Sequence, residues 1–545
     1  MSKKVDGSTF LKGAAILGLA SLFSKMLGLI YRIPYQNITG DLGYYVYTQV
    51  YPLYGTLLIL ATAGFPIAIS KMVSEKLALG DVYGVRKVFR VSVVTLVFTG
   101  LITFAGLYSA ADWIALKMGN HQLALPIRSV SFALLIVPPM AAMRGYFQGH
   151  QNMAPTAISQ ISEQFVRVAT IIFLAYWFMN TTGNEYLAGA GAVFGAFTGA
   201  LTGFLVLLVF WRHNKKAQVI TVDADAARRF PEESSLSLIK RILYYAIPIC
   251  FGALVLPLLQ LSDSFTVANL LVKTGYPAEE ANILKGIFDR GQPLVSFGAF
   301  FATALSLSLV PAISEANARR AYATIQNRAE LALRLTLMIG LPTSIGLAVV
   351  AEPVNIMLYQ NNEGTLALIV LSFTTIFSTL GITSAGILQG LGKVILPARN
   401  LLVGVLFKVG LNMIFIPILG ITGASLATVI AYAVATALNL RAVVRYTNIK
   451  IRFQSFFIKP LLAVLMMAIV VLAVERLSMN IFVDVISSYR LYFSVVAFIS
   501  VLTGAIAYGI ALLISGSITK TDMQLIPKVN KIVPLLSKLH LLREK

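Results

Sequence analysis

The 545-residue sequence contains few charged residues, and this scarcity excludes a water-soluble fold. Asp, Glu, Lys and Arg make up 12% of the chain, whereas hydrophobic residues make up 57%. Soluble domains usually carry about 25% charged residues, so this chain lacks the polar surface that water requires. Each membrane span needs about 20 mostly apolar residues. The composition therefore predicts an all-α polytopic membrane protein.

Cysteine and histidine are also scarce. Cys250 is the single cysteine, which excludes a disulfide framework and a Cys-rich metal site. The four histidines show no metal-ligand spacing. The glycines of 386–392 follow no predicted strand and precede no Lys-Ser/Thr pair, so they indicate no nucleotide site. We therefore expect a transporter rather than an enzyme, with no metal and no cofactor. Na⁺ coupling, H⁺ coupling and the membrane potential all stay open as energy sources.

Hydropathy predicts about 14 transmembrane helices. The net charge is +21, but no basic module separates from the spans, so we expect no nucleic-acid partner. Of the 44 Lys and Arg residues, 32 fall in or beside predicted cytoplasmic segments, five in predicted outer loops and seven inside spans. Arg144 belongs to the first group and Lys285 to the second. Because cytoplasmic loops are enriched in these cations, both termini are predicted to be cytoplasmic.

The two halves of the sequence resemble each other. The Gln-Gly pair at 148–149 maps onto the same pair at 389–390, at an offset of 241 residues. A second echo joins 66–70 to 311–314 at an offset of about 244. Repeated halves are typical of secondary transporters, whose substrate site lies between the repeats.

The repeat and the charge pattern together predict the organisation of the chain. We expect two six-helix lobes plus two C-terminal helices: an N-lobe (1–211, spans 1–6), a cytoplasmic linker (212–236), a C-lobe (237–446, spans 7–12), spans 13 and 14 (447–515) and a basic cytoplasmic tail (516–545).

Cations inside the predicted spans are the candidate substrate-binding residues. A charge at the bilayer centre costs about 2.5–3.5 kcal/mol on insertion scales, so each must face protein or water. Lys25 and Arg32 lie seven residues apart in the first span and share a helix face. Arg290 lies near Gly and Pro in the eighth span, and its planar fork suits phosphate oxygens. An interfacial anchor is the alternative for Arg32, and a local pair with Asp289 is the alternative for Arg290.

Other charges within spans have structural alternatives. Glu163 and Arg167 are spaced i, i+4, which predicts an intrahelical pair rather than a substrate contact. Lys408, which lies 241 residues after Arg167, shares a face of the eleventh span with Asn412. No Lys or Arg lies within four positions of Asp263 in the seventh span. Asp263 and Lys408 either pair between helices or mark an ion-coupling site, and both interpretations stay open.

Several motifs resemble those of a known exporter superfamily. Segment 23–28 resembles the first-span motif of MurJ-type lipid II flippases, and 289–293 with 309–314 resembles their eighth span. Segment 144–164 resembles a signature of polysaccharide exporters and stage V sporulation protein B relatives. The whole pattern resembles the multidrug/oligosaccharidyl-lipid/polysaccharide (MOP) exporter superfamily, and in particular its Gram-positive YtgP-type lipid II flippases.

This resemblance implies an alternating-access flippase in a bacterial cell membrane. Its substrate would be undecaprenyl-pyrophosphate-linked peptidoglycan precursor (lipid II), moved from the inner to the outer leaflet for cell wall biogenesis and cell shape. The partners implied are this lipid-linked pyrophosphoryl oligosaccharide, membrane lipids and wall-synthesis proteins. The resemblance places pyrophosphate binding at Lys25 and Arg290, with Arg32 one position from a family Arg. The segment 52–56 lacks the Arg that the family often has there. The alternatives are an ion-coupled multidrug or cation exporter of this fold, or a flippase for another lipid-linked oligosaccharide.

Overall fold

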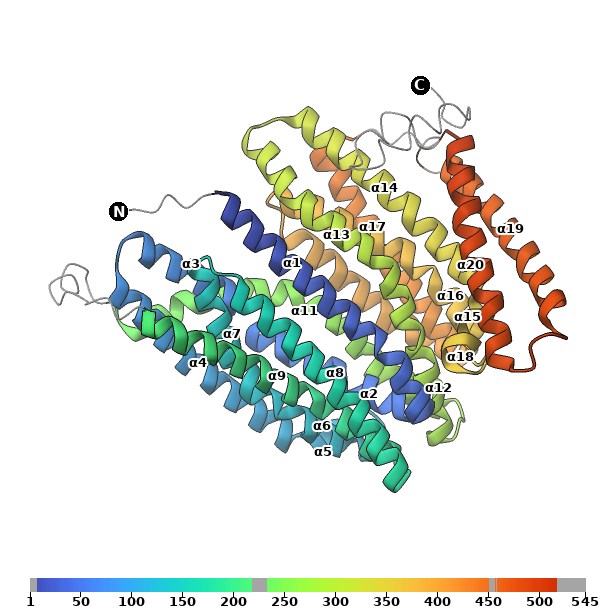
Figure 1. Cartoon of the computed structure of the whole chain (residues 1–545), viewed down its shortest axis with the longest axis horizontal. Helices are drawn as coiled ribbons and strands as arrows, with labels where there is room; N and C mark the ends of the chain where they lie inside the picture. Colours follow the sequence, from blue (N-terminus) through green and yellow to red (C-terminus); the bar gives the residue numbers. More distant parts are fainter. Residues whose placement is uncertain (1–6, 218–232, 450–455, 457, 517–545) are drawn as a thin grey trace. The chain divides into compact units, whose positions relative to one another are not determined.

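The computed structural model of the chain describes residues 7–217, 233–449, 456 and 458–516. These residues form helices joined by short turns, with no strand among them, as the composition predicts (Figure 1). The N-terminal part comprises α1 (Gly7–Ile30), α2 (Arg32–Thr62), α3 (Phe65–Ala78), α4 (Val82–Ser109), α5 (Ala111–Lys117), η1 (His121–Leu123), α6 (Ala124–Ser131), α7 (Ala133–Gly149), α8 (Ala154–Thr182), α9 (Glu185–Ala217) and α11 (Ser235–Lys273). The remainder comprises α12 (Ala278–Asp289), α13 (Gly291–Ala318), α14 (Tyr322–Val349), α15 (Ala351–Tyr359), α16 (Thr365–Ser372), α17 (Thr374–Gly390), α18 (Ile395–Thr447), α19 (Lys459–Phe482) and α20 (Tyr489–Ile514).

Helix α2 is sharply folded at Gly40, where φ is +69°, a conformation that suits glycine. In one straight helix, residues 16 positions apart would be separated by about 24 Å. Instead, the hydroxyl groups of Tyr31 and Tyr47 are hydrogen-bonded and their ring centroids lie 6.0 Å apart. The chain therefore reverses direction at Gly40, between the first and second predicted spans.

Helix α18 contains a second reversal, at Gly420, where φ is +57°. Asn400 Nδ2 donates to Asn439 Oδ1 at 2.9 Å, although these residues would lie about 58 Å apart in a straight helix. Eleven stretches within the described residues are helical, long and apolar enough to cross a membrane, and two of them contain these reversals. The chain is therefore a multi-pass membrane protein, and the number of 14 spans stays a prediction.

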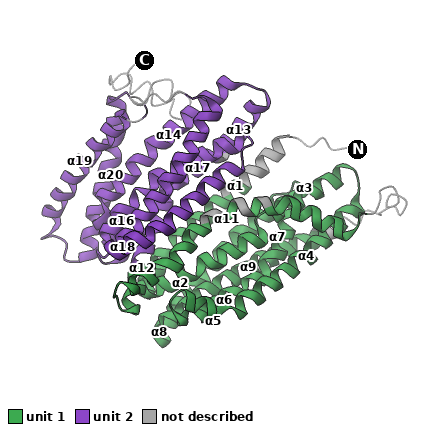
Figure 2. Ribbon diagram, turned by 180° about the vertical axis from the view of Figure 1, so that it is seen from behind, with its two compact units in different colours: residues 1–286 green, residues 287–545 purple. Residues whose placement is uncertain are grey.

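The helices group into two compact units, residues 1–286 and 287–545 (Figure 2). Helix α11 packs against α2, α3 and α4 and so belongs to the first unit. In the predicted organisation the same segment opens the C-lobe, so the units defined by contacts and the lobes defined by the repeat divide the chain differently. Most of the predicted linker, and nearly all of the predicted basic tail, lie outside the described residues.

The helix bounds repeat along the chain. Helices α4 and α14 have the same length and are offset by 240 residues. The pairs α6 and α16, and α7 and α17, each match in length at an offset of 241. Helices α8 and α18 also begin 241 residues apart. The repeat that the 148–149 echo predicts therefore extends over several consecutive helices.

Equivalent glycines make equivalent helix contacts in the two units. A Cβ on Gly149 of α7 would lie 2.6 Å from Val73 Cβ, and one on Gly390 of α17 would lie 2.7 Å from Ile313 Cβ. Such small residues let membrane helices approach closely. Val73 and Ile313 are 240 residues apart, so α3 and α13 correspond at that offset. The echo between 66–70 and 311–314, at an offset of about 244, is thus about one helical turn out of this structural register.

We predict that Gly390→Val destabilises the protein, because the new side chain would overlap Ile313 and the carbonyl oxygen of Val310. Overpacking of this kind typically costs about 1–3 kcal/mol. Gly410→Val is the matched control, because a Cβ there meets open space. The apparent melting temperature of each purified protein in detergent measures the effect. Equal melting temperatures for the two variants would contradict the packing role of Gly390.

Candidate functional site

A buried ion triad joins α7 and α8 in the first unit. Arg144 Nη2 donates to Glu163 Oε2 at 2.8 Å, and Arg167 Nη2 donates to Glu163 Oε1 at 2.7 Å. The three side chains are only 11–15% exposed. The intrahelical pair that the i, i+4 spacing predicts is therefore present, but it is part of a larger network. Arg144 also donates to Ser159 Oγ at 2.9 Å, which anchors the triad to the start of α8.

Glycines of α9 enclose this triad. A Cβ on Gly199 would lie 2.8 Å from Arg167 Cβ, and one on Gly203 would lie 3.2 Å from Glu163 Cβ. Ser159 Oγ donates to the carbonyl of Gly203 at 3.0 Å. The four-residue spacing of these glycines places both on one face of α9. Close packing along this face therefore shields the ion triad from the medium around the helices.

Tyrosines of α2 connect the triad to Arg32. Arg167 Nη1 lies 3.4 Å from the Tyr51 hydroxyl, and Tyr51 stacks on Tyr47 with ring centroids 5.3 Å apart. The half-buried Arg32 lies within electrostatic range of both phenols. We call Arg32, Tyr51, Arg144, Glu163 and Arg167 the cation–tyrosine cluster.

Positive charge is in excess within the cation–tyrosine cluster. It contains three guanidinium groups and one carboxylate, that of Glu163, which pairs with Arg144 and Arg167, whereas Arg32 lies near tyrosines. The Nε atoms of all three arginines are buried and have no hydrogen-bond partner in the structure. Burial of a charged group is costly unless its charge and its hydrogen bonds are satisfied. The cluster therefore carries a net positive charge in the interior of the first unit.

Lys25 lies one helix earlier than Arg32. Its side chain is exposed in α1, and α1 packs along α8. Gly28 allows this approach, because a Cβ there would lie 3.2 Å from Gln164 Nε2. Lys25 and Arg32 thus flank the helix break at Tyr31, and the predicted role of both residues in substrate binding stays a prediction.

Arg290 lies in the second unit, at the break between α12 and α13, with only 2% of its surface exposed. Its Nη2 donates to Asn361 Oδ1 at 2.7 Å and to the carbonyl of Glu363. Its guanidinium also lies over the Tyr359 ring, 5.2 Å from the centroid, and its own carbonyl accepts from the Tyr359 hydroxyl at 2.7 Å. Arg290 therefore fastens the α15–α16 connection through hydrogen bonds to a side-chain oxygen and a backbone oxygen.

The remaining candidate residues are divided between the units. Asp263 of α11 is 3% exposed and lies in the first unit, whereas Lys408 and Asn412 of α18 are 2% and 0% exposed and lie in the second. Lys408 and Asn412 are both buried, as their shared helix face predicts. The pairing or ion-coupling role of Asp263 with Lys408 stays a prediction.

Two features of the site were not predicted. Arg144 was assigned to a cytoplasmic edge, and Lys285 to an outer loop, but Arg144 joins the buried triad and Lys285 is 1% exposed within α12. The register of the α7–α8 hairpin carries the missed signal. Arg144 and Ser159 are equidistant from the turn at 150–153, so antiparallel helices place them side by side.

We predict that Glu163→Gln strongly destabilises the protein, because it leaves two buried guanidinium groups without their carboxylate. Breaking a buried ion pair in this way costs about 3–5 kcal/mol. Glu315→Gln is the matched control, since the Glu315–Arg319 pair has side chains that are 56% and 76% exposed and exposed pairs contribute about 0.5 kcal/mol. Apparent melting temperatures in detergent compare the two. A Glu163→Gln protein as stable as the Glu315→Gln protein would contradict the structural importance of the triad.

Residues 10–317 match the family model of polysaccharide biosynthesis proteins. The chain is 38% identical to the uncharacterized membrane protein YabM of Bacillus subtilis (strain 168), with 86% of each chain covered. It is 31% identical to the lipid II flippase MurJ of the same organism, over 78% of this chain and 80% of that one.

Solved structures share the fold. The inward closed conformation of the lipid II flippase MurJ matches with a TM-score of 0.62 at 16% identity, covering 91% of this chain and 99% of that one. An inward-facing multidrug resistance MATE family transporter of the MOP superfamily matches with a TM-score of 0.63 at 16% identity, covering 78% of this chain and 94% of that one. The chain therefore belongs to the polysaccharide biosynthesis protein family and is a MurJ-like membrane protein whose fold is that of MOP superfamily transporters.

Proposed function

We propose that this protein is a flippase that moves lipid II, a polyprenyl-pyrophosphate-linked saccharide, from the inner to the outer leaflet of the cell membrane. The observation that carries the proposal is the excess of guanidinium groups over carboxylates in the cation–tyrosine cluster. A pyrophosphate has several charged oxygens, and guanidinium forks bind such oxygens in pairs. The 31% identity to a lipid II flippase supports the same substrate class.

In this proposal Lys25, Arg32 and Arg290 bind the pyrophosphate at successive stages of the transport cycle. Arg290 is held in this structure by the neutral oxygens of Asn361 and Glu363. Phosphate oxygens would replace these partners when the substrate binds, since a charged acceptor makes a stronger hydrogen bond with a guanidinium than a neutral one does. Binding would then release the α15–α16 connection, which couples substrate capture to a change in the second unit.

Energy coupling forms a second part of the proposal. The buried carboxylate of Asp263 would take Na⁺ or H⁺, and Lys408 with Asn412 would supply the alternative ammonium partner when the ion is absent. The membrane potential would act on any net charge that crosses with the substrate, at about 2.3 kcal/mol per elementary charge for 100 mV.

A multidrug or cation exporter is the second candidate, and the similarity in fold to a MATE family transporter favours it. A site for cationic drugs needs carboxylates that are free to bind them. Within the cation–tyrosine cluster, the carboxylate of Glu163 already accepts from two arginines. The charge balance of the cluster therefore favours an anionic substrate.

We predict that Lys25→Ala and Arg290→Ala each lower lipid II exposure on the outer leaflet by about tenfold or more, because a lost hydrogen bond to a charged group costs about 1.5–3 kcal/mol. Spheroplasts of cells that depend on this protein, treated with an externally added probe of lipid II, measure the exposure. Lys273→Ala is the control, because Lys273 is an exposed lysine outside the candidate site.

Membrane abundance of every variant is measured in parallel, and Arg290→Lys separates the charge of Arg290 from its fork-shaped geometry. Normal lipid II exposure in Lys25→Ala and Arg290→Ala cells at normal abundance would contradict the proposal. Drug sensitivity that changes on deletion, while lipid II exposure stays normal, would instead favour the exporter.

A further inference from the structure

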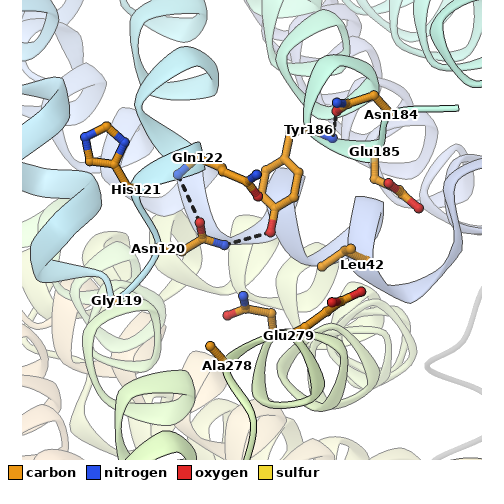
Figure 3. A pocket seen from close by; sticks show the side chains of 11 residues that line it. Leu42, Gly119, Asn120, His121, Gln122, Asn184, Glu185, Tyr186, Ala278 and Glu279 are labelled. Atoms are coloured by element: carbon orange, nitrogen blue, oxygen red, sulfur yellow. Dashed lines mark hydrogen bonds between the residues drawn. The ribbon is translucent and has the colours of Figure 1, made fainter. Parts of the chain in front are cut away.

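A separate polar pocket lies at the helix ends of the first unit (Figure 3). Its volume is ≈ 500 Å³, within the ~300–1,000 Å³ range of small-molecule sites. Four segments line it: the start of α2 after Gly40, the α5–η1 turn, the α8–α9 connection and the start of α12. The last three are segments that the predicted topology places outside the membrane, on the outer face of the cell.

The pocket is distinct from the cation–tyrosine cluster. The cluster residue Arg167 lies within α8 and the pocket residue Asn184 just after its end, 17 positions further along the chain, which corresponds to roughly 25 Å along a helix. No residue of the cation–tyrosine cluster lines the pocket.

Hydrogen bonds hold the walls of the pocket in place. Asn120 Nδ2 donates to the Tyr186 hydroxyl at 2.8 Å, and Asn120 Oδ1 accepts from the backbone N–H of Gln122 at 3.0 Å, as Figure 3 shows. Asn184 Oδ1 accepts from the backbone N–H groups of Tyr186 and Leu187, and so caps α9. Gly119, with φ +84°, turns the chain between α5 and η1. The pocket is therefore built before any ligand arrives, which lowers the entropic cost of binding.

The chemistry of the lining selects the ligand. The pocket presents several carboxamides, a phenol and an imidazole, together with the carboxylates of Glu185 and Glu279, and no Lys or Arg lines it. A phosphate would meet two negative charges and no cation, so this pocket disfavours the pyrophosphate that the cation–tyrosine cluster suits. Hydrocarbon is disfavoured too, because Leu42 and Ala278 are the only aliphatic side chains in the lining.

A saccharide fits this lining on three counts. Carboxylates accept hydrogen bonds from sugar hydroxyls, and carboxamides both donate and accept. The phenol of Tyr186 adds an aromatic face, and its hydroxyl is already fixed by Asn120. Asn282 is 6% exposed at the base of α12, whereas Gln122 and Glu279 are exposed at the pocket wall, so polar groups are available at more than one depth.

We propose that this pocket is a saccharide-binding site on the outer face of the protein. The identity of the ligand rests on the proposed function, in which the saccharide is the headgroup of the transported lipid after it reaches the outer leaflet. The cations within the spans would then bind the pyrophosphate during transport, and the outer pocket would bind the neutral saccharide at a later stage.

The test is direct binding of a soluble disaccharide of N-acetylated amino sugars to the purified full chain in nanodiscs, by calorimetric titration. We expect saturable binding, with the Kd raised about tenfold or more by Gln122→Ala combined with Glu279→Ala, because this double variant removes a carboxamide and a charged hydrogen-bond acceptor. Glu280→Ala is the matched control. Glu280 is the exposed neighbour of Glu279 on α12 and does not line the pocket, so its variant should bind within twofold of the original protein.

Three results would overturn the inference: no saturable binding by the original protein, equal binding by the double variant, or equal losses in the double variant and in Glu280→Ala. Titration with Ca²⁺ tests whether the pocket binds a cation instead. Ca²⁺ binding that depends on Glu279, without any disaccharide binding, would make the pocket a cation site. The lipid II exposure assay separates the two proposals. Disaccharide binding without lipid II exposure rejects the flippase, and normal lipid II exposure without disaccharide binding rejects the pocket.

Discussion

The interior of the first unit depends on one carboxylate shared by two guanidinium groups. Glu163 accepts from Arg144 of α7 and from Arg167 of its own helix, and each charge would be far more costly to bury without the others. The network requires that α9 approach α8 closely, which Gly199 and Gly203 allow. It also brings Tyr51 of α2 against Arg167. The close approach of α9 to α8 and the position of Tyr51 are thus both linked to the same three charged side chains.

The second unit repeats the helices of the first but does not repeat the ion triad. Lys408 stands where the repeat places Arg167, and it too is buried, at 2% exposure. Position 404, four residues before Lys408, is a glycine, whereas Glu163 stands four residues before Arg167, so the acidic partner of the triad is not repeated. Among the contacts of Arg290 in this unit are hydrogen bonds to an amide oxygen and a backbone carbonyl. Duplication preserved the architecture while the charges diverged, which is expected when the fold serves the whole superfamily and the side chains serve one substrate.

Much of the fold follows from the sequence, because hydropathy and charge asymmetry are properties of whole segments. The helical class, the internal repeat and the Glu163–Arg167 pair could all be predicted. The burial of Arg144 and Lys285 was not predicted, because it depends on hairpin register and on side-chain length, whereas the prediction used only position relative to a span. The tyrosines of α2 carried a signal in their three- and four-residue spacing, but such a stripe is more often ordinary packing than a charge-stabilising surface.

Solved structures of a lipid II flippase and of a multidrug transporter match the fold with similar TM-scores, so the choice between these functions depends on the side chains. Charge is a better guide, because it must complement the substrate at close range in a medium of low dielectric. An amphipathic lipid with an anionic linkage and an uncharged glycan needs two binding environments: a cationic one for the linkage and a cation-free polar one for the glycan. The cation–tyrosine cluster and the cation-free outer pocket are such a pair. A small cationic drug would need neither, so the separation of the two chemistries along the first unit argues for a substrate with chemically distinct parts.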